Sequence, residues 1–550
     1  MLRHALRLRA AAPAGRFSRH SGTVASPATD NAPVLGWMGR PETDANRPEE
    51  EFLPARTPAD VDREHFREAP SVRFWNAWRH DDSKSPAASV ADILAQISAA
   101  TKSPADAAYW AYHVFRSSWF LGQGAAGMLV SSVAGAGPEA APTLSRARAG
   151  AAAAERLVSE AVQVYAQDLK RVNDGTHRAP YDMDPRHRQF NPAFVADKSL
   201  RFASEARSTL RKHAAATKQR LAREGEGSAT EVGAEDSEET HVWLSSPLYP
   251  DYYLNTFHWQ TDGWLSKASA EVYEVSTETL FVGRQDAMQR TALAPLREWF
   301  DETQESATGE NVKLLEMACG TGRFLTFTRD TYPKMDAVGL DLSPFYLAEA
   351  RENAKYWERF RTGAFNASGG NAGNARAVAS LATGALRRVG SLAKAAGVPL
   401  PPLPASLRAE ADSVSSAAED ARDAPNLGSC EFVQAAAESM PFPDESFDAV
   451  TCVYLFHELP PAVRREAARE AARVLKPGGV FILADSIQLG DRPLVDAHLG
   501  RFGDFNEPYY RSWLREDTVE LFGERGAGLE PWTKELCSST KVLSFRKPLK

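Results

Sequence analysis

The chain has 550 residues, of which 43% are hydrophobic and 25% are charged, and its formal net charge is −8. Its length exceeds the roughly 250–300 residues at which one hydrophobic core stops growing, so we expect at least two structural units. An acidic chain lacks the basic surface that nucleic-acid phosphates require, so nucleic acid is not an expected partner and a small molecule or a protein is favoured.

Residues 1–30 have the composition of an organellar transit peptide. No acidic residue precedes Asp30, and five arginines stand among alanine, leucine and serine: Arg3, Arg7, Arg9, Arg16 and Arg19. Mitochondrial and plastid targeting segments share this composition, so we expect a mitochondrial location, with the plastid as the alternative. A basic N-terminus without a targeting role is the simplest other interpretation. Residues 31–65, rich in proline and acids, are predicted to be a disordered linker.

Residues 66–222 are predicted to form a separate, mostly α-helical domain. Aromatic and aliphatic residues recur there at helical spacings, which is typical of buried amphipathic helices. The stretch 107–138 ends in a long uncharged run, which is one feature of a membrane-spanning helix. Its many glycines and serines instead favour a packed hairpin or association with a membrane surface. The acidic residues 223–240 are predicted to be a linker.

A polar loop within this helical region carries side chains that bind metals in other proteins. They are His177, Asp182, Asp184 and His187. Their spacing matches no helical zinc motif, so we predict a solvated loop and no metal site.

Residues 241–550 are predicted to form an α/β domain that begins with a nucleotide-binding turn. A buried strand ending at Met317 runs into a turn with Gly320 and Gly322, whose backbone can approach a ligand because glycine has no Cβ. The next strand ends at Asp341, about 20 residues later, where such a unit presents a carboxylate to a ribose diol. Leu325 stands where a dinucleotide fingerprint has its third glycine, so a dinucleotide site is not favoured.

Later segments resemble the class I S-adenosylmethionine-dependent methyltransferases. The segments are MPFPDESFDAV at 440–450 and RVLKPGG at 473–479. They are most similar to the type 11 methyltransferase domain and, within it, to the ubiquinone and menaquinone C-methyltransferases. The resemblance covers about residues 310–490. It implies a Rossmann-like, seven-stranded methyltransferase sheet, S-adenosyl-L-methionine as cofactor, and methyl transfer to a small-molecule acceptor.

The resemblance also implies a set of cofactor-binding residues. They are Glu316, Ala318, Gly320, Thr321, Gly322, Asp341, Leu342, Ala437, Glu438 and Tyr454. Glu316 and the glycine turn would hold the methionine end, Asp341 the ribose and Leu342 the adenine. Two positions depart from the family pattern. Ala318 replaces a glycine, which is costly if its φ is positive, and Ala436 replaces an aspartate that meets the adenine amino group.

The predicted catalytic residues are His457, His258 and Asp262. His457 follows the fourth strand of the domain, at the edge where doubly wound sheets bind ligands, and an imidazole with a pKa of about 6.5 accepts protons at neutral pH. It could instead cap the loop or pack on the cofactor. His258 and Asp262 belong to an aromatic segment that opens a predicted lid, residues 249–310.

The aromatic density of this lid favours a small aromatic or lipophilic, quinone-like acceptor, against plain packing as the alternative. A low-complexity insertion, residues 362–427, is predicted to interrupt the sheet without a catalytic role. A different class of function stays open, namely a catalytically silent methyltransferase-fold assembly or binding factor in an organelle. Ala318, Ala436 and the helical domain motivate it, and the oligomeric state is left open.

Overall fold

A computed structural model gives the fold of most of the chain. It describes residues 54–81, 83–84, 86–135, 144–225, 248–255, 257, 262–303, 307–363, 427–500 and 507–549. The predicted transit peptide, nearly all of the acidic linker and most of the low-complexity insertion lie outside these residues.

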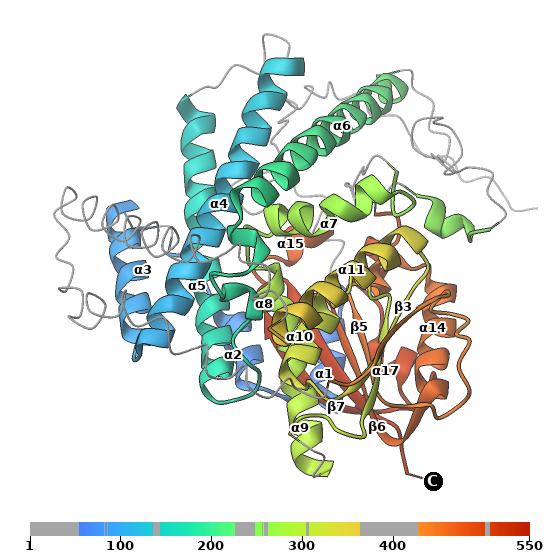
Figure 1. Cartoon of the computed structure of the whole chain (residues 1–550). Helices are drawn as coiled ribbons and strands as arrows, with labels where there is room; N and C mark the ends of the chain where they lie inside the picture. Colours follow the sequence, from blue (N-terminus) through green and yellow to red (C-terminus); the bar gives the residue numbers. More distant parts are fainter. Residues whose placement is uncertain are drawn as a thin grey trace, which may run out of the picture.

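One eight-stranded sheet forms the centre of the molecule, in the order β1-β7-β8-β6-β5-β2-β3-β4 (Figure 1). The strands are β1 Arg67–Glu68, β2 Lys313–Met317, β3 Asp336–Asp341, β4 Cys430–Gln434, β5 Phe447–Val453, β6 Leu475–Ser486, β7 Glu530–Cys537 and β8 Thr540–Arg546. β8 runs antiparallel to β6 and β7, and the other described neighbours are parallel. The predicted Rossmann-like methyltransferase sheet is therefore confirmed, and β1 adds one strand at its edge.

Helices cover both faces of this sheet. Those of the C-terminal part are α7 Lys267–Leu280, α8 Gln285–Gln289, α9 Leu293–Thr303, α10 Arg323–Thr331, α11 Pro344–Arg361, α14 Pro461–Val474, α15 Asp496–Leu499, α16 Tyr510–Trp513 and α17 Thr518–Phe522. Local sequence explains the start of α11, because the Ser343 side chain accepts from the Tyr346 N–H and Pro344 occupies the first turn.

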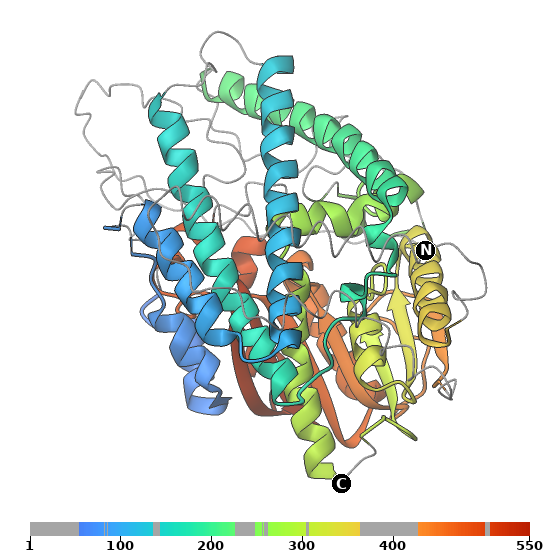
Figure 2. The ribbon, with the colours of Figure 1, turned by 60° about the vertical axis from the view of Figure 1, so that its left-hand side comes forward.

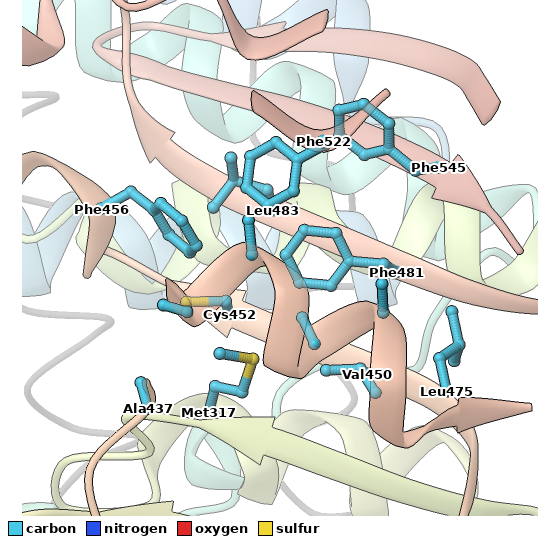
Figure 3. Packing of buried hydrophobic residues seen from close by; sticks show 14 of the residues in the cluster. Met317, Ala437, Val450, Cys452, Phe456, Leu475, Phe481, Leu483, Phe522 and Phe545 are labelled. Carbon is cyan, nitrogen blue, oxygen red and sulfur yellow. The ribbon is translucent and has the colours of Figure 1, made fainter. Parts of the chain in front are cut away.

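Alternating side chains of the strands divide the core between the two faces. Val480 and Ile482 of β6 lie in one hydrophobic cluster, and Phe481 and Leu483 lie in another, as the two-residue period of a strand requires. Figure 3 shows the second cluster, where Phe481 packs beside Phe522 of α17. Because both faces of the central strands are buried, their sequences are nearly continuously apolar.

The N-terminal region is mostly helical, as the sequence predicts, and its helices share a hydrophobic cluster with the C-terminal part. They are α1 Pro58–His65, α2 Pro70–Ala77, α3 Pro86–Ala100, α4 Pro104–Gly135, α5 Leu144–Asn173 and α6 Pro192–Gly225 (Figures 1 and 2). Trp75 and Tyr165 of these helices are buried in one cluster with Leu489 and Leu536 of the C-terminal part. The end of the predicted linker 31–65 is helical, since α1 begins at Pro58 with a capping box.

A buried ionic cluster fastens α1 to the sheet. The Lys534 ammonium of β7 donates to Asp62 at 2.9 Å and to Asp491 at 2.6 Å, and Lys541 of β8 also pairs with Asp62. Burial opposes ionisation of Asp62, but Lys541 and Lys534 outweigh it and hold the pKa of Asp62 below its ordinary value. The charges are thus compensated only when the N-terminal segment is in place.

None of the described helices, α4 included, combines the length with the apolar character that crossing a bilayer demands. Association of residues 107–138 with a membrane surface stays a prediction.

Candidate functional site

The turn between β2 and α10 opens on a cavity and is built around two glycines with positive φ. Gly320 has φ +54°, and a Cβ placed on it would meet only Tyr346 Cδ1, at 4.0 Å. Gly322 has φ +73°, and its Cβ would lie 3.3 Å from Ala350 of α11. Gly320 therefore leaves space for a ligand, whereas Gly322 lets two helices approach closely.

The carboxylate of Asp341 is held rigidly at the end of β3. One oxygen accepts the Gly320 N–H at 2.9 Å and the other accepts the Ser343 N–H at 2.8 Å. Burial raises the pKa of Asp341 to about 6, against the opposing effect of these N–H donors. The carboxylate is thus ionised at neutral pH, and each oxygen keeps a lone pair for a further donor.

The cavity beside Asp341 has about 740 Å³ of atom-free space, part of it open to solvent. Its described walls are Tyr252, Tyr253, Trp264, Tyr273, Ala318, Gly320, Leu340, Asp341, Leu342, Tyr346, Ala435, Ala436, Ala437, Val453, Tyr454, Leu455, Glu458 and Leu459. Six of the predicted cofactor residues are in this set: Ala318, Gly320, Asp341, Leu342, Ala437 and Tyr454. A cavity lined by aromatic and apolar side chains with a few fixed polar groups is typical of small-ligand sites.

Two non-glycine residues of the wall have left-handed backbone conformations. Ala318 has φ +53° and Tyr454 has φ +56°. This conformation costs an L-residue about 1–2 kcal/mol, and such strain is concentrated at functional sites. Ala318, which stands in the family's glycine position, therefore carries the conformational cost of a positive φ.

Four predicted cofactor residues lie outside the described wall. Glu316 is buried below the turn, where burial and then the charge of Asp341 raise its pKa well above the usual range. The Thr321 hydroxyl donates to Glu274 of α7 at 2.9 Å, and Gly322 packs on α11. Glu438 accepts the hydroxyl of Tyr252, a wall residue, at 2.7 Å. Their positions favour support of the site over contact with its ligand.

The residue after the turn ties it to the N-terminal helices. Arg323 of α10 is paired with Asp182, in η4 (Tyr181–Met183), and with Asp286 of α8. Burial opposes ionisation of Asp182, but Arg323 outweighs it and lowers the pKa of Asp182 to about 2. The loop that the sequence predicts as solvated is thus partly buried, because its acid neutralises a buried arginine. No cluster of metal-ligating side chains occurs in the described part of the chain.

The aromatic segment before α7 closes one side of the cavity through Tyr252, Tyr253 and Trp264. Tyr253 and Phe257 pack on Trp264, whose carbonyl accepts the Ser343 hydroxyl. The later part of the predicted lid does not face the cavity, since Trp299 and Phe300 of α9 lie in the core of the sheet. This later part of the predicted lid, residues 249–310, therefore belongs to the core.

The structure does not bring the predicted catalytic residues into the described wall. His457, in η12 (Phe456–Glu458), bonds through Nδ1 to Asp485 of β6. Burial alone would lower the pKa of His457, but Asp485, Glu458 and Glu507 raise it to about 9. An imidazole protonated at neutral pH is not a general base. Asp262 is half-buried outside the wall, and His258 lies outside the described residues.

Tyr346, Tyr273 and Glu458 are among the wall residues that were not predicted as site residues. Tyr346 lies one turn into α11, where the Ser343 cap aims it at the glycine turn, and Tyr273 lies on the inward face of α7 with Ala270. Glu458 follows His457, and 8% of its surface is exposed. Helix register gave a signal for both tyrosines, since each sits three residues beyond a buried small residue.

These residues fit S-adenosyl-L-methionine group by group. Asp341 offers free lone pairs to ribose hydroxyls, and Leu342 and Ala437 provide apolar surface beside it for adenine. Gly320 leaves room for the methionine part, and the tyrosine and tryptophan faces attract a sulfonium cation. The predicted aspartate contact to the adenine amino group is absent at Ala436, which lines the cavity.

Comparisons with known proteins agree with this geometry. A methyltransferase domain family matches residues 407–483. An uncharacterized methyltransferase of Bacillus subtilis is 41% identical over 88 residues, which are 16% of this chain and 32% of that protein. A ubiquinone/menaquinone C-methyltransferase of Bartonella henselae is 44% identical over 66 residues, 12% of this chain and 24% of that protein. A demethylmenaquinone methyltransferase of Listeria welshimeri is 35% identical over 107 residues, which are 18% of this chain and 44% of that protein.

The chain thus spans less than half the length of each of these relatives. Among solved structures, a putative O-methyltransferase of Nostoc punctiforme has a TM-score of 0.30 at 15% identity, covering 52% of this chain and 61% of that one. The sequence motifs, the strand order and the matching family model identify a methyltransferase domain within the C-terminal part of this chain.

Proposed function

We propose that this chain is an S-adenosylmethionine-dependent methyltransferase that acts on a small aromatic or lipophilic acceptor. The observation that carries the proposal is the carboxylate of Asp341, fixed by two backbone N–H groups at the mouth of an aromatic cavity. When bound, the cofactor supplies a methyl group on a sulfonium. The chain then has only to hold donor and acceptor in line and to keep water out.

The walls of the cavity support the acceptor class. Tyr252, Tyr253, Tyr273 and Trp264 line the cavity together with Asp341, and aromatic side chains suit flat apolar ligands. The relatives from Bartonella and Listeria are named for ubiquinone and menaquinone substrates. A quinone-like acceptor is accordingly one member of the proposed class.

Calorimetry with S-adenosylhomocysteine on the full chain tests the cofactor site. We expect micromolar binding by the wild type and at least a tenfold loss in Asp341→Ala, because the ribose hydroxyls lose their acceptor. Asp336→Ala is the matched control, since Asp336 begins the same strand and is exposed. Absence of binding at millimolar ligand, or an equal loss in both variants, would contradict the proposal.

A catalytically silent assembly or binding factor is the second candidate, and the strained Ala318 favours it. It requires that Asp341→Ala leave the cellular function intact while a stable protein complex copurifies. The N-terminal helices are a weaker argument for this second candidate, because they share a hydrophobic core with the sheet and so contribute to the fold itself.

Location and surface attachment complete the proposal. We propose a mitochondrial location, with the plastid as the alternative. The localisation of a fluorescent protein fused to residues 1–30 tests this proposal. Attachment to a membrane surface through 107–138 is supported by exposed Val114, Phe115 and Trp119 on α4. Flotation with lipid vesicles should then fail for a Phe115→Ser/Trp119→Ser double variant.

A further inference from the structure

The N-terminal region reaches the glycine turn through the connection between α5 and α6. This connection contains η4 and a second short helix, η5 (Arg188–Phe190). From η4, Asp182 pairs with Arg323, the residue that follows the turn. From η5, the Arg188 guanidinium donates to the side-chain oxygen of Asn353 on α11. The N-terminal region thus contacts both α10 and α11, the two helices that border the turn.

Asn353 carries this contact to the turn itself. Its amide nitrogen donates to the Thr321 carbonyl at 3.0 Å and to Oε1 of Glu274, on α7, at 3.1 Å. The Thr321 hydroxyl donates to the same Glu274 oxygen at 2.9 Å. Only 5% of Asn353 is exposed, so water cannot readily replace a lost contact. The hydrogen bonds close a triangle around Thr321, which stands between Gly320 and Gly322.

Arg188 determines which way the Asn353 amide points. A side-chain amide has an accepting oxygen and a donating nitrogen, and a half-turn exchanges them. With its oxygen on the Arg188 guanidinium, the amide directs its nitrogen at two acceptors, the Thr321 carbonyl and the Glu274 carboxylate. The reverse orientation would set oxygen against both acceptors and nitrogen against a guanidinium, which has donors alone. A cation of the N-terminal region therefore selects the donor that holds the turn.

The same triangle extends to the tyrosine side of the cavity. Glu274 follows Tyr273, a wall residue whose ring packs edge-on against Tyr346, with 5.3 Å between the ring centres. Tyr346 lies about two helical turns before Asn353, on the same face of α11. Holding Glu274 against Thr321 therefore fixes the aromatic wall relative to the turn.

We propose that Arg188, Asn353 and Glu274 are positioning residues, through which the N-terminal helices hold the glycine turn in the conformation that binds the cofactor. This inference rests on the proposed function, and it makes the N-terminal region a part of the methyltransferase site. Glycines give the turn more conformational freedom than other residues would, so its conformation depends on outside contacts. None of the three residues belongs to the described cavity wall, so they act through Thr321.

Asn353→Asp tests the inference, because it keeps the shape of the side chain and an acceptor for Arg188 but removes the donor. Calorimetry with S-adenosylhomocysteine on the full chain should show an affinity about tenfold below that of the wild type. Hydrogen exchange of the unliganded chain, measured by mass spectrometry, should be faster in the peptide that carries the turn. A general loss of stability would instead spread over the sheet.

Asn76→Asp is the matched control. Asn76 of α2 also donates to two backbone acceptors, the carbonyls of Gly490 at 3.4 Å and Asp491 at 3.3 Å, and so joins an N-terminal helix to the C-terminal part. The variant loses the same kind of contact away from the turn. It should bind S-adenosylhomocysteine within about twofold of the wild type and leave exchange at the turn unchanged.

The other two residues allow a conservative rescue and an independent loss. Glu274→Gln keeps an oxygen that accepts from Thr321 and Asn353, so it should retain most of the affinity for S-adenosylhomocysteine, whereas Glu274→Ala should lose about tenfold. Arg188→Ala should weaken binding in the same direction, because the Asn353 amide loses the partner that orients it. The thermal midpoint of each variant verifies that it is folded.

Wild-type affinity or wild-type exchange at the turn in Asn353→Asp would overturn the inference. Equal losses of affinity in Asn353→Asp and Asn76→Asp, or in Glu274→Gln and Glu274→Ala, would overturn it as well. If S-adenosylhomocysteine does not bind the wild type, the proposed function fails first. Exchange at the unliganded turn still tests the positioning role in that case, so the two failures are distinguishable.

Discussion

Replacing Ala318 by glycine should stabilise the protein, although glycine usually destabilises. The φ of +53° at Ala318 costs an alanine about 1–2 kcal/mol, and glycine adopts it freely. Glycine gives the unfolded chain extra freedom, which costs about 0.4–1 kcal/mol. Taken at the middle of both ranges, the difference is a net gain of about 0.8 kcal/mol, or roughly 2–3 °C in thermal midpoint.

Urea unfolding, followed by tryptophan fluorescence, measures this gain as a higher midpoint with an unchanged slope. Ala436→Gly is the matched control, because Ala436 also lines the cavity but has no positive φ. It should lose about 0.4–1 kcal/mol, so the two variants should move in opposite directions. If Ala318→Gly is destabilised as much as the control, the left-handed conformation of Ala318 is wrong.

Three further predictions follow from buried charges. Affinity for S-adenosylhomocysteine should fall as the pH drops below about 6, where Asp341 becomes protonated, and Asp341→Asn should bind weakly at every pH in calorimetry. Because the pKa of His457 is raised in the fold, its protonated form stabilises the protein by up to about 3 kcal/mol below pH 6.5, and this contribution should disappear as the pH rises through 9. Urea unfolding should show this fall in the free energy of unfolding for the wild type and not for His457→Gln. Asp62→Asn should lose about 3–5 kcal/mol by leaving buried lysines uncompensated, whereas Arg63→Gln, which breaks an exposed pair, should lose less than about 1 kcal/mol in the same assay.

Local signals made the methyltransferase half of the fold predictable. The glycine turn, the serine cap of α11 and the apolar strands each depend on residues that are close in sequence. The partner of β1 is more than 450 residues away, and no local pattern in Arg67–Glu68 distinguishes it from a loop. The shared core was missed for the same reason, since amphipathic helices do not reveal which surface they cover.

The candidate site shows a similar division. Asp341 and Gly320 could be placed from spacing, because a strand-turn-helix-strand unit brings them together by itself. The sequence placed His457 at the correct edge of the sheet. Only the structure shows that its ring is bonded to Asp485 of β6 and does not line the cavity. The sign of φ at Ala318 likewise could not be read from its identity.

The edge strand β1 has a consequence for the order of folding. Arg67 and Glu68 pair with Thr533 and Lys534, which are made some 465 residues later, roughly 25–90 s at ordinary rates of synthesis. During that interval Asp62 lacks the lysines that compensate it, and Trp75 lacks part of its apolar surroundings. The nascent N-terminal helices therefore stay incomplete until the last strands emerge, and a chain cut before residue 530 would expose them to chaperones and proteases.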